Sequence, residues 1–150
     1  MSDAMKELPG FNERGDLPEG IHAATLEMVL TRFSVTPHRA IIGRRLERIY
    51  ALASSTGSVA RFIIFGSFIT AKPAPNDVDI FLLMEDSFDV RKVPSEAHLV
   101  FDHAAAQNLL GASVFWLRKA AALGGEEATI AHWQIKRDGG KRGIVEVTKL

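Results

Sequence analysis

The feature that most constrains this chain is a pair of carboxylates set into an otherwise apolar strand. Asp77 and Asp79 alternate with Val78 and Ile80 and lead directly into the apolar run 81–84. Because alternate side chains of a strand share a face, both carboxylates should converge on one place. Two like charges held so close repel each other, and a cation between them removes the repulsion. The pattern therefore predicts that Asp77 and Asp79 are ligands of Mg²⁺, which commonly takes one or two carboxylates together with substrate phosphates.

A second motif lies just upstream of the carboxylates. The apolar stretch 61–65 ends in Gly66 and Ser67, and nine residues separate Ser67 from Asp77. A glycine lets a phosphate approach the backbone closely, and a helix beginning over 68–71 would direct free N–H groups at that phosphate. Lys72 follows, either as a point charge for a triphosphate or as an ordinary surface lysine. Gly66, Ser67 and Lys72 are the predicted nucleotide-binding residues.

Together the two motifs resemble the signature of the DNA polymerase β-like nucleotidyltransferase superfamily. That signature is an apolar residue, Gly, then Gly or Ser, a spacer, and then Asp, apolar, Asp or Glu, apolar. Its positions are matched here by Phe65, Gly66, Ser67, Asp77, Val78, Asp79 and Ile80. The resemblance implies a Mg²⁺-dependent transfer of a nucleotidyl group from a nucleoside triphosphate, with Asp77 and Asp79 as catalytic metal ligands.

The looser likeness is to small, stand-alone bacterial members of that superfamily. It suggests a toxin–antitoxin setting, in which the acceptor hydroxyl belongs to a partner protein, a tRNA end or a small molecule. The alternative is a module of the same fold that is weak or inactive as a transferase and that binds a nucleotide or a partner protein. The likeness distinguishes neither the acceptor nor the preferred triphosphate.

One expected element of the superfamily is not found at its expected position. Active members usually carry a third carboxylate on a later strand, and the corresponding strand here, 112–117, places Ser113 and Phe115 at the alternating positions. Two-metal phosphoryl transfer uses such a group to hold the attacking oxygen. Three readings stay open: Glu146 supplies it, Asp102 supplies it, or the site has two carboxylates only.

Composition sets the broader limits. Lys plus Arg and Asp plus Glu both number 18, so the formal net charge is zero and a strong general field for nucleic acid is not expected. Cysteine is absent, which excludes disulfides and thiolate metal sites. We expect no membrane span, because no apolar run is long enough, and no signal peptide in the polar segment 1–13. A cytoplasmic location is the simplest expectation.

The order of elements predicts an α/β or α+β chain with a small mixed sheet flanked by helices, similar to the nucleotidyltransferase core. We expect an irregular arm over 1–20 and one domain over 21–150 that ends in a β-hairpin. The predicted elements are helices over 21–33, 37–56 (capped by Thr36) and 95–109, strands over 59–65, 77–84 and 112–117, and hairpin strands over 131–136 and 143–147. Four arginines, at 39, 44, 45 and 48, should lie mostly on the polar, solvated side of their helix. Exposed sheet edges are compatible with a homodimer.

Overall fold

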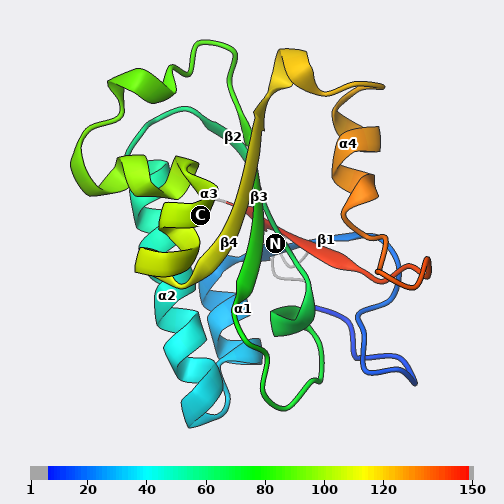
Figure 1. Ribbon diagram of the computed structural model, residues 1–150. Helices are drawn as coiled ribbons and strands as arrows, with labels where there is room; N and C mark the ends of the chain where they lie inside the picture. Colours follow the sequence, from blue (N-terminus) through cyan, green and yellow to red (C-terminus); the bar gives the residue numbers. More distant parts are fainter. Residues whose placement is uncertain (1–6, 149–150) are drawn as a thin grey trace.

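The fold is built on one five-stranded mixed sheet, in a computed structural model that describes residues 7–148. The strands are β1 (Ile21–Thr25), β2 (Val59–Phe65), β3 (Val78–Met84), β4 (Ala112–Arg118) and β5 (Ile144–Thr148). Their order across the sheet is β1-β5-β2-β3-β4 (Figure 1). The predicted class, a mixed sheet with flanking helices, is confirmed, whereas the likeness to a nucleotidyltransferase core stays a prediction.

Strand pairing determines which side chains share a face. β2 and β3 are antiparallel, with Phe65 opposite Asp79. β3 and β4 are parallel, with Ser113 opposite Asp79. Directly paired residues project to the same side of a sheet. Phe65, Asp79 and Ser113 therefore form one row across three neighbouring strands.

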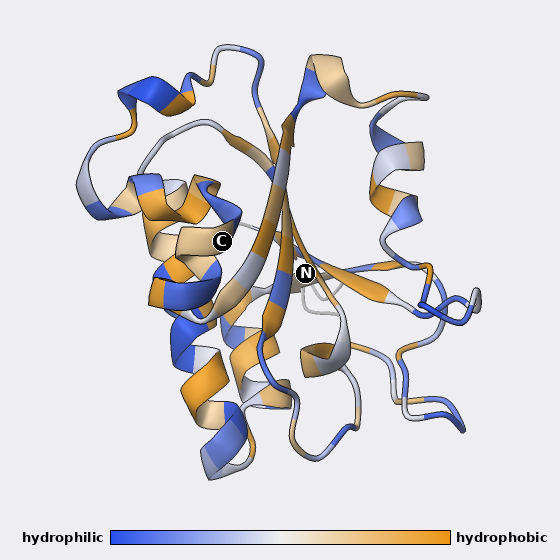
Figure 2. Ribbon diagram, viewed as in Figure 1, coloured by the Kyte–Doolittle hydropathy of each residue, from blue (hydrophilic) through white to orange (hydrophobic). Residues whose placement is uncertain are grey.

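Helices cover the two faces of the sheet unequally. The helices α1 (Leu26–Phe33) and α2 (Pro37–Ser54) lie on one face, together with the crossover between β3 and β4 that contains α3 (His103–Ala105) (Figure 1). α4 (Glu126–His132) lies on the other face. A large apolar core fills the first interface, and a smaller one, which includes Ile130, fills the second. The central strands are mostly hydrophobic along their length, as Figure 2 shows, because both of their faces are covered.

Several predicted elements agree with the structure. α2 begins at Pro37, and the side chain of Thr36 caps it by accepting a hydrogen bond from the backbone N–H of Arg39 at 3.2 Å. The strands expected over 59–65, 77–84 and 112–117 are present within one residue at each end. The arm is irregular over 7–20 as expected, and its first six residues lie outside the described part.

The helix predicted over 21–33 is wrong in its first part. Residues 21–25 form β1, which pairs in parallel with β5, and Thr25 then caps α1 by accepting from the backbone N–H of Met28. Five residues make too short a window to separate a strand from a helix by periodicity. The partner strand lies at the far end of the chain, and its pairing decides the conformation.

The predicted C-terminal hairpin is also wrong. Residues 126–132 form α4, and the turn that follows contains a single bridge between Ile135 and Lys141. β5 does form, but it lies between β1 and β2 and has no hairpin partner. Ile130, the buried residue of α4, packs on the sheet, and this burial outweighs the strand propensity of the segment. The helix predicted over 95–109 is a succession of short 3-10, α and π turns that ends at Gly111.

No helix in the described part of the chain is both long enough and apolar enough to cross a membrane.

Candidate functional site

Asp77 and Asp79 meet at the beginning of β3, on the face that the smaller core occupies. Asp77 immediately precedes the strand and Asp79 is its second residue, and both side chains are half-buried. The hydroxyl of Ser113 on β4 donates a hydrogen bond to Asp77 Oδ2 at 2.8 Å. The sequence-predicted pair is thus brought together, with the Ser113 hydroxyl as a third oxygen group beside it.

Gly66 is in direct contact with the Asp79 carboxylate. Its φ angle is +81°, in the region that favours glycine. A Cβ atom added there would lie 2.8 Å from Asp79 Cγ, with a still shorter approach to Oδ2. Two separate requirements therefore select glycine at this position: the backbone conformation of the turn and the space taken by the carboxylate.

The two carboxylates perturb each other. Burial, and after it the charge of Asp77, raises the pKa of Asp79 to about 6, while Arg142, Arg137 and the Ser113 hydroxyl oppose the rise. No described cation lies within ion-pair distance of either carboxylate. At neutral pH the pair therefore carries negative charge that the described side chains do not pair, which is the condition in which a divalent cation is favoured.

The loop between Gly66 and Asp77 is fixed by a buried arginine. Arg39, only 4% exposed, donates hydrogen bonds through its guanidinium to the carbonyl oxygens of Phe68 and Thr70, both at 2.7 Å, and of Lys72 at 2.5 Å. A further bond to the carbonyl of Phe33 anchors the same group to α1. The expected solvated position of Arg39 is therefore wrong. Its residue type does not distinguish it from Arg44, so sequence reasoning missed it.

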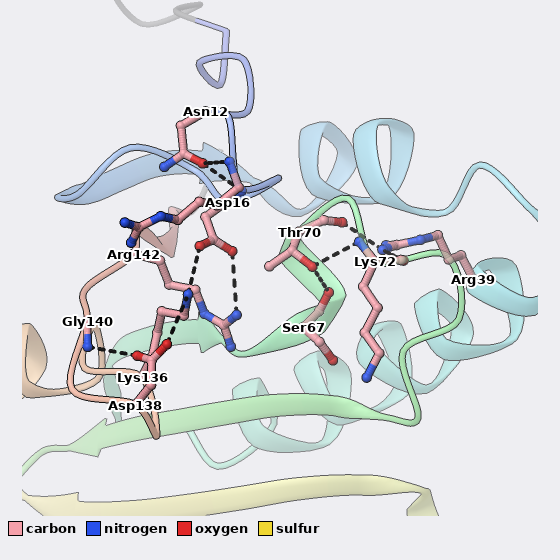
Figure 3. Close-up of polar contacts among 11 residues, drawn as sticks. Asn12, Asp16, Arg39, Ser67, Thr70, Lys72, Lys136, Asp138, Gly140 and Arg142 are labelled. Carbon is pink, nitrogen blue, oxygen red and sulfur yellow. Dashed lines mark hydrogen bonds and ion pairs between the residues drawn. The ribbon is translucent and has the colours of Figure 1, made fainter.

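Other contacts hold the same loop at both ends. Thr70 Oγ1 donates to the carbonyl of Ser67 at 2.7 Å, and the backbone N–H of Ala71 donates to the carbonyl of Gly15 at 2.8 Å. His38 Nε2 lies 2.6 Å from the carbonyl of Pro75. Several loop carbonyls are therefore occupied by these contacts. In Figure 3 the side chains of Ser67 and Lys72 extend in the same direction, away from the guanidinium of Arg39.

A basic loop flanks the site from the C-terminal side. Asp16 in the N-terminal arm is 4% exposed and lies 3.3 Å from Lys136 Nζ and 3.5 Å from Arg142 Nη1 (Figure 3). The loop between these two cations also contains Arg137, one of the charges that opposes the pKa rise of Asp79. The cluster of basic residues is visible in the sequence, but no local pattern indicates that Asp16 pairs with two of them.

Neither candidate for a third carboxylate reaches the pair. Glu146 lies on β5, which pairs with β1 and β2 and not with β3, and its oxygens accept from Arg61 at 2.7 and 2.8 Å. Asp102 caps α3 by accepting from the backbone N–H of Ala105 at 3.0 Å. Within residues 7–148, no group of three or more His, Cys, Asp or Glu side chains is arranged to hold a metal ion. The described site has two carboxylates and a serine.

Comparison with known proteins assigns a family without a function. The model of the family of unknown function DUF6932 matches residues 9–148. The chain belongs to this family. The match to DUF6932 covers every helix and strand described above, from β1 to β5. No curated protein and no solved structure gives a significant match.

Proposed function

We propose that this protein is a Mg²⁺-dependent nucleotidyltransferase, which moves a nucleoside monophosphate group from a nucleoside triphosphate to a hydroxyl acceptor. The observation that carries the proposal is the pairing of Asp77 and Asp79, without a described cation between them, beside the Gly66 turn. The donor set suits Mg²⁺, which binds through one or two carboxylates and completes its coordination with water and substrate phosphates. When bound, the ion supplies charge neutralisation of the phosphate oxygens.

The residues of the chain would divide the remaining work. Gly66 and Ser67 receive the triphosphate, and the contacts of Arg39 keep that turn in place before substrate arrives. Lys72, whose side chain extends in the same direction as that of Ser67 in Figure 3, adds one positive charge. Because phosphoryl transfer depends mostly on positioning and electrostatic stabilisation, a rigid turn next to two fixed carboxylates supports this chemistry.

The proposed step exchanges one phosphorus–oxygen bond for another. The acceptor oxygen forms a bond to the α-phosphorus while the bond from that phosphorus to the α–β bridging oxygen breaks. Pyrophosphate leaves with the bridging oxygen and its electron pair, and the proton of the acceptor hydroxyl is released to solvent.

The first test is thermal unfolding with each nucleoside triphosphate, with and without Mg²⁺. We expect a Mg²⁺-dependent rise in the melting temperature for the wild type, because a ligand at 100 times its Kd adds about 2.7 kcal/mol of stability. The double variant Asp77→Asn/Asp79→Asn should lose this rise. Glu47→Gln, an exposed acidic position on α2, is the matched control and should keep it. A rise that persists in the double variant would refute the proposed metal site.

A second candidate function is a nucleotide-binding module without turnover. Ser113, opposite Asp79 where a third carboxylate would be expected, favours it. Release of pyrophosphate separates the two candidates: a transferase produces it when acceptor is present, whereas a module shows the Mg²⁺-dependent stabilisation alone.

A further inference from the structure

The basic loop beside the carboxylate pair lies near Asp79 without pairing with it. This loop, 136–142, is located between α4 and β5 and contains four basic residues and one acidic residue: Lys136, Arg137, Asp138, Lys141 and Arg142. The charges of Arg142 and Arg137 both oppose the rise in the pKa of Asp79, yet among the described residues neither arginine forms an ion pair with that carboxylate. A ligand that carries both signs of charge would complete this arrangement.

The N-terminal arm holds the basic loop in place. Asp16, only 4% exposed, lies 3.3 Å from Lys136 Nζ and 3.5 Å from Arg142 Nη1 (Figure 3). The carbonyl of the next residue, Leu17, accepts a hydrogen bond from the backbone N–H of Gly143 at 2.9 Å. The position of Arg142 is therefore fixed both by its side chain and by the backbone that follows it.

The same arm segment contacts the loop that begins at Gly66. The carbonyl of Gly15 accepts a hydrogen bond from the backbone N–H of Ala71 at 2.8 Å. Gly15 has a φ of +79°, and an added Cβ would lie 3.1 Å from Cβ of Ala71, so the two segments are closely packed. The consecutive residues 15–17 thus join the basic loop to the turn that is predicted to receive a triphosphate.

Arg142 keeps hydrogen-bond donors for a ligand. Its side chain is 24% exposed, and among the described residues its one ion pair is that with Asp16. Because a guanidinium has five N–H donors, most of them remain available. Arg137 is exposed, and no described carboxylate lies within ion-pair distance of it. Two guanidinium groups that act on Asp79 are therefore accessible to an anion.

We propose that the basic loop binds the terminal phosphates of the nucleoside triphosphate, with Arg142 as the main contact and Asp16 as the residue that positions it. The inference rests on the proposed nucleotidyltransferase function. Mg²⁺ is commonly bound by carboxylates and substrate phosphates together, so a metal-bound triphosphate presents a cation to Asp77 and Asp79 and anionic oxygens to the arginines. Guanidinium donors match phosphate oxygens in a fork geometry. The loop then holds the two phosphates that leave as pyrophosphate.

Binding of inorganic triphosphate in the presence of Mg²⁺ tests the loop without a nucleoside. We expect Arg142→Gln to weaken this binding about tenfold, because charge-assisted hydrogen bonds are lost. Lys141→Gln removes the same charge from an exposed neighbour that is not among the charges acting on Asp79. It is the matched control and should bind as the wild type does. Equal weakening in the two variants would overturn the inference, because it would show an effect of net charge alone.

Arg137→Gln protects the test from a folding defect at Arg142. Because Arg137 is exposed and makes no described ion pair, this variant should fold normally and bind inorganic triphosphate about threefold more weakly. Binding that is unchanged in both arginine variants would overturn the inference.

The positioning role of Asp16 has its own readout in a double-mutant cycle. Asp16→Asn should weaken the binding of inorganic triphosphate in the wild type, and it should have no effect in the Arg142→Gln background, where the group to be positioned is absent. Tighter binding by Asp16→Asn would show that Asp16 competes with the phosphates for Arg142, and would overturn this role. Failure of the proposed function has a different signature: binding of inorganic triphosphate that depends on Arg142, without Mg²⁺-dependent stabilisation by any nucleoside triphosphate.

Discussion

Two carboxylate positions on the same face of the sheet have opposite electrostatic environments. Glu146 on β5 accepts two hydrogen bonds from Arg61, and that guanidinium also pairs with Glu126 and Glu127 at the end of α4. Asp79 on β3 lies against Asp77 and Gly66 and has no described cation within ion-pair distance. The first arrangement links three elements of the fold. The second is costly to the folded protein unless something binds to it, and so it is the one that suggests function.

The largest expected effect on stability comes from removing Arg61, the partner of Glu146. Arg61→Ala should lower the free energy of unfolding by about 3–4 kcal/mol, because it leaves Glu146 half-buried without its partner. Urea denaturation at pH 7 measures this. Glu146→Gln keeps the shape and some of the hydrogen bonding and should cost less. Equal stability of Arg61→Ala and the wild type would show that the Arg61 network is a surface feature.

The next largest effect on stability concerns Gly66, which contacts the Asp79 carboxylate. Gly66→Ala should cost about 2–3 kcal/mol, from a positive φ angle and from displacement of the Asp79 side chain. A double-mutant cycle with Asp79→Ala separates the two causes, because the contact part disappears when the carboxylate is absent. If the cost of Gly66→Ala is the same in both backgrounds, the contact with Asp79 contributes nothing.

Removing the charge of Asp79 should have the opposite sign. Without metal, we expect Asp79→Asn to raise the free energy of unfolding by about 1–2 kcal/mol at pH 7.5, because it removes a charged group that burial and Asp77 disfavour. Denaturation in EDTA tests this. A destabilised Asp79→Asn would mean that the described side chains already compensate the pair.

The smallest effect is the pH dependence of the same group. The folded-state pKa of Asp79, about 6, lies above the value of about 3.9 for an unfolded aspartate. The native state therefore binds the proton more tightly, and stability should rise as the pH falls from 7.5 to 5. The contribution is about 1 kcal/mol, read as the difference between the wild type and Asp79→Asn. A difference between the two proteins that does not change with pH would contradict the raised pKa.

A structural feature could be predicted from the sequence when the residues that determine it lie close together in the chain. The strands next to Gly66 and Asp79, and the cap at Thr36, follow from patterns within a few residues, and all were expected. The direction of Asp77 and Asp79 follows from strand alternation alone. The role of Arg39 could not be predicted, because its acceptors are carbonyl groups about thirty residues further along the chain.

The terminal strands illustrate the same limit. Residues 21–25 lack a decisive periodicity, and only pairing with β5 makes them a strand. The environment of Glu146 could not be predicted from the sequence either, because it depends on β5 lying beside β2. If this strand had been half of a hairpin beside β3, Glu146 could have reached Asp77 and Asp79. The observed strand order instead brings it to Arg61.

The position of β5 has a consequence for the way the chain is made. β5 lies between β1 and β2, so the first strand of the sheet has no neighbour until β5, more than a hundred residues further along the chain, has been synthesised. Until then β1 and one edge of β2 present unpaired backbone groups, and such edges invite association with other chains. The pair β2–β3 and its crossover to β4 can form earlier, since their partners are close in sequence. Assembly should therefore begin around Gly66 and Asp79 and finish with the insertion of β5, which brings Glu146 to Arg61.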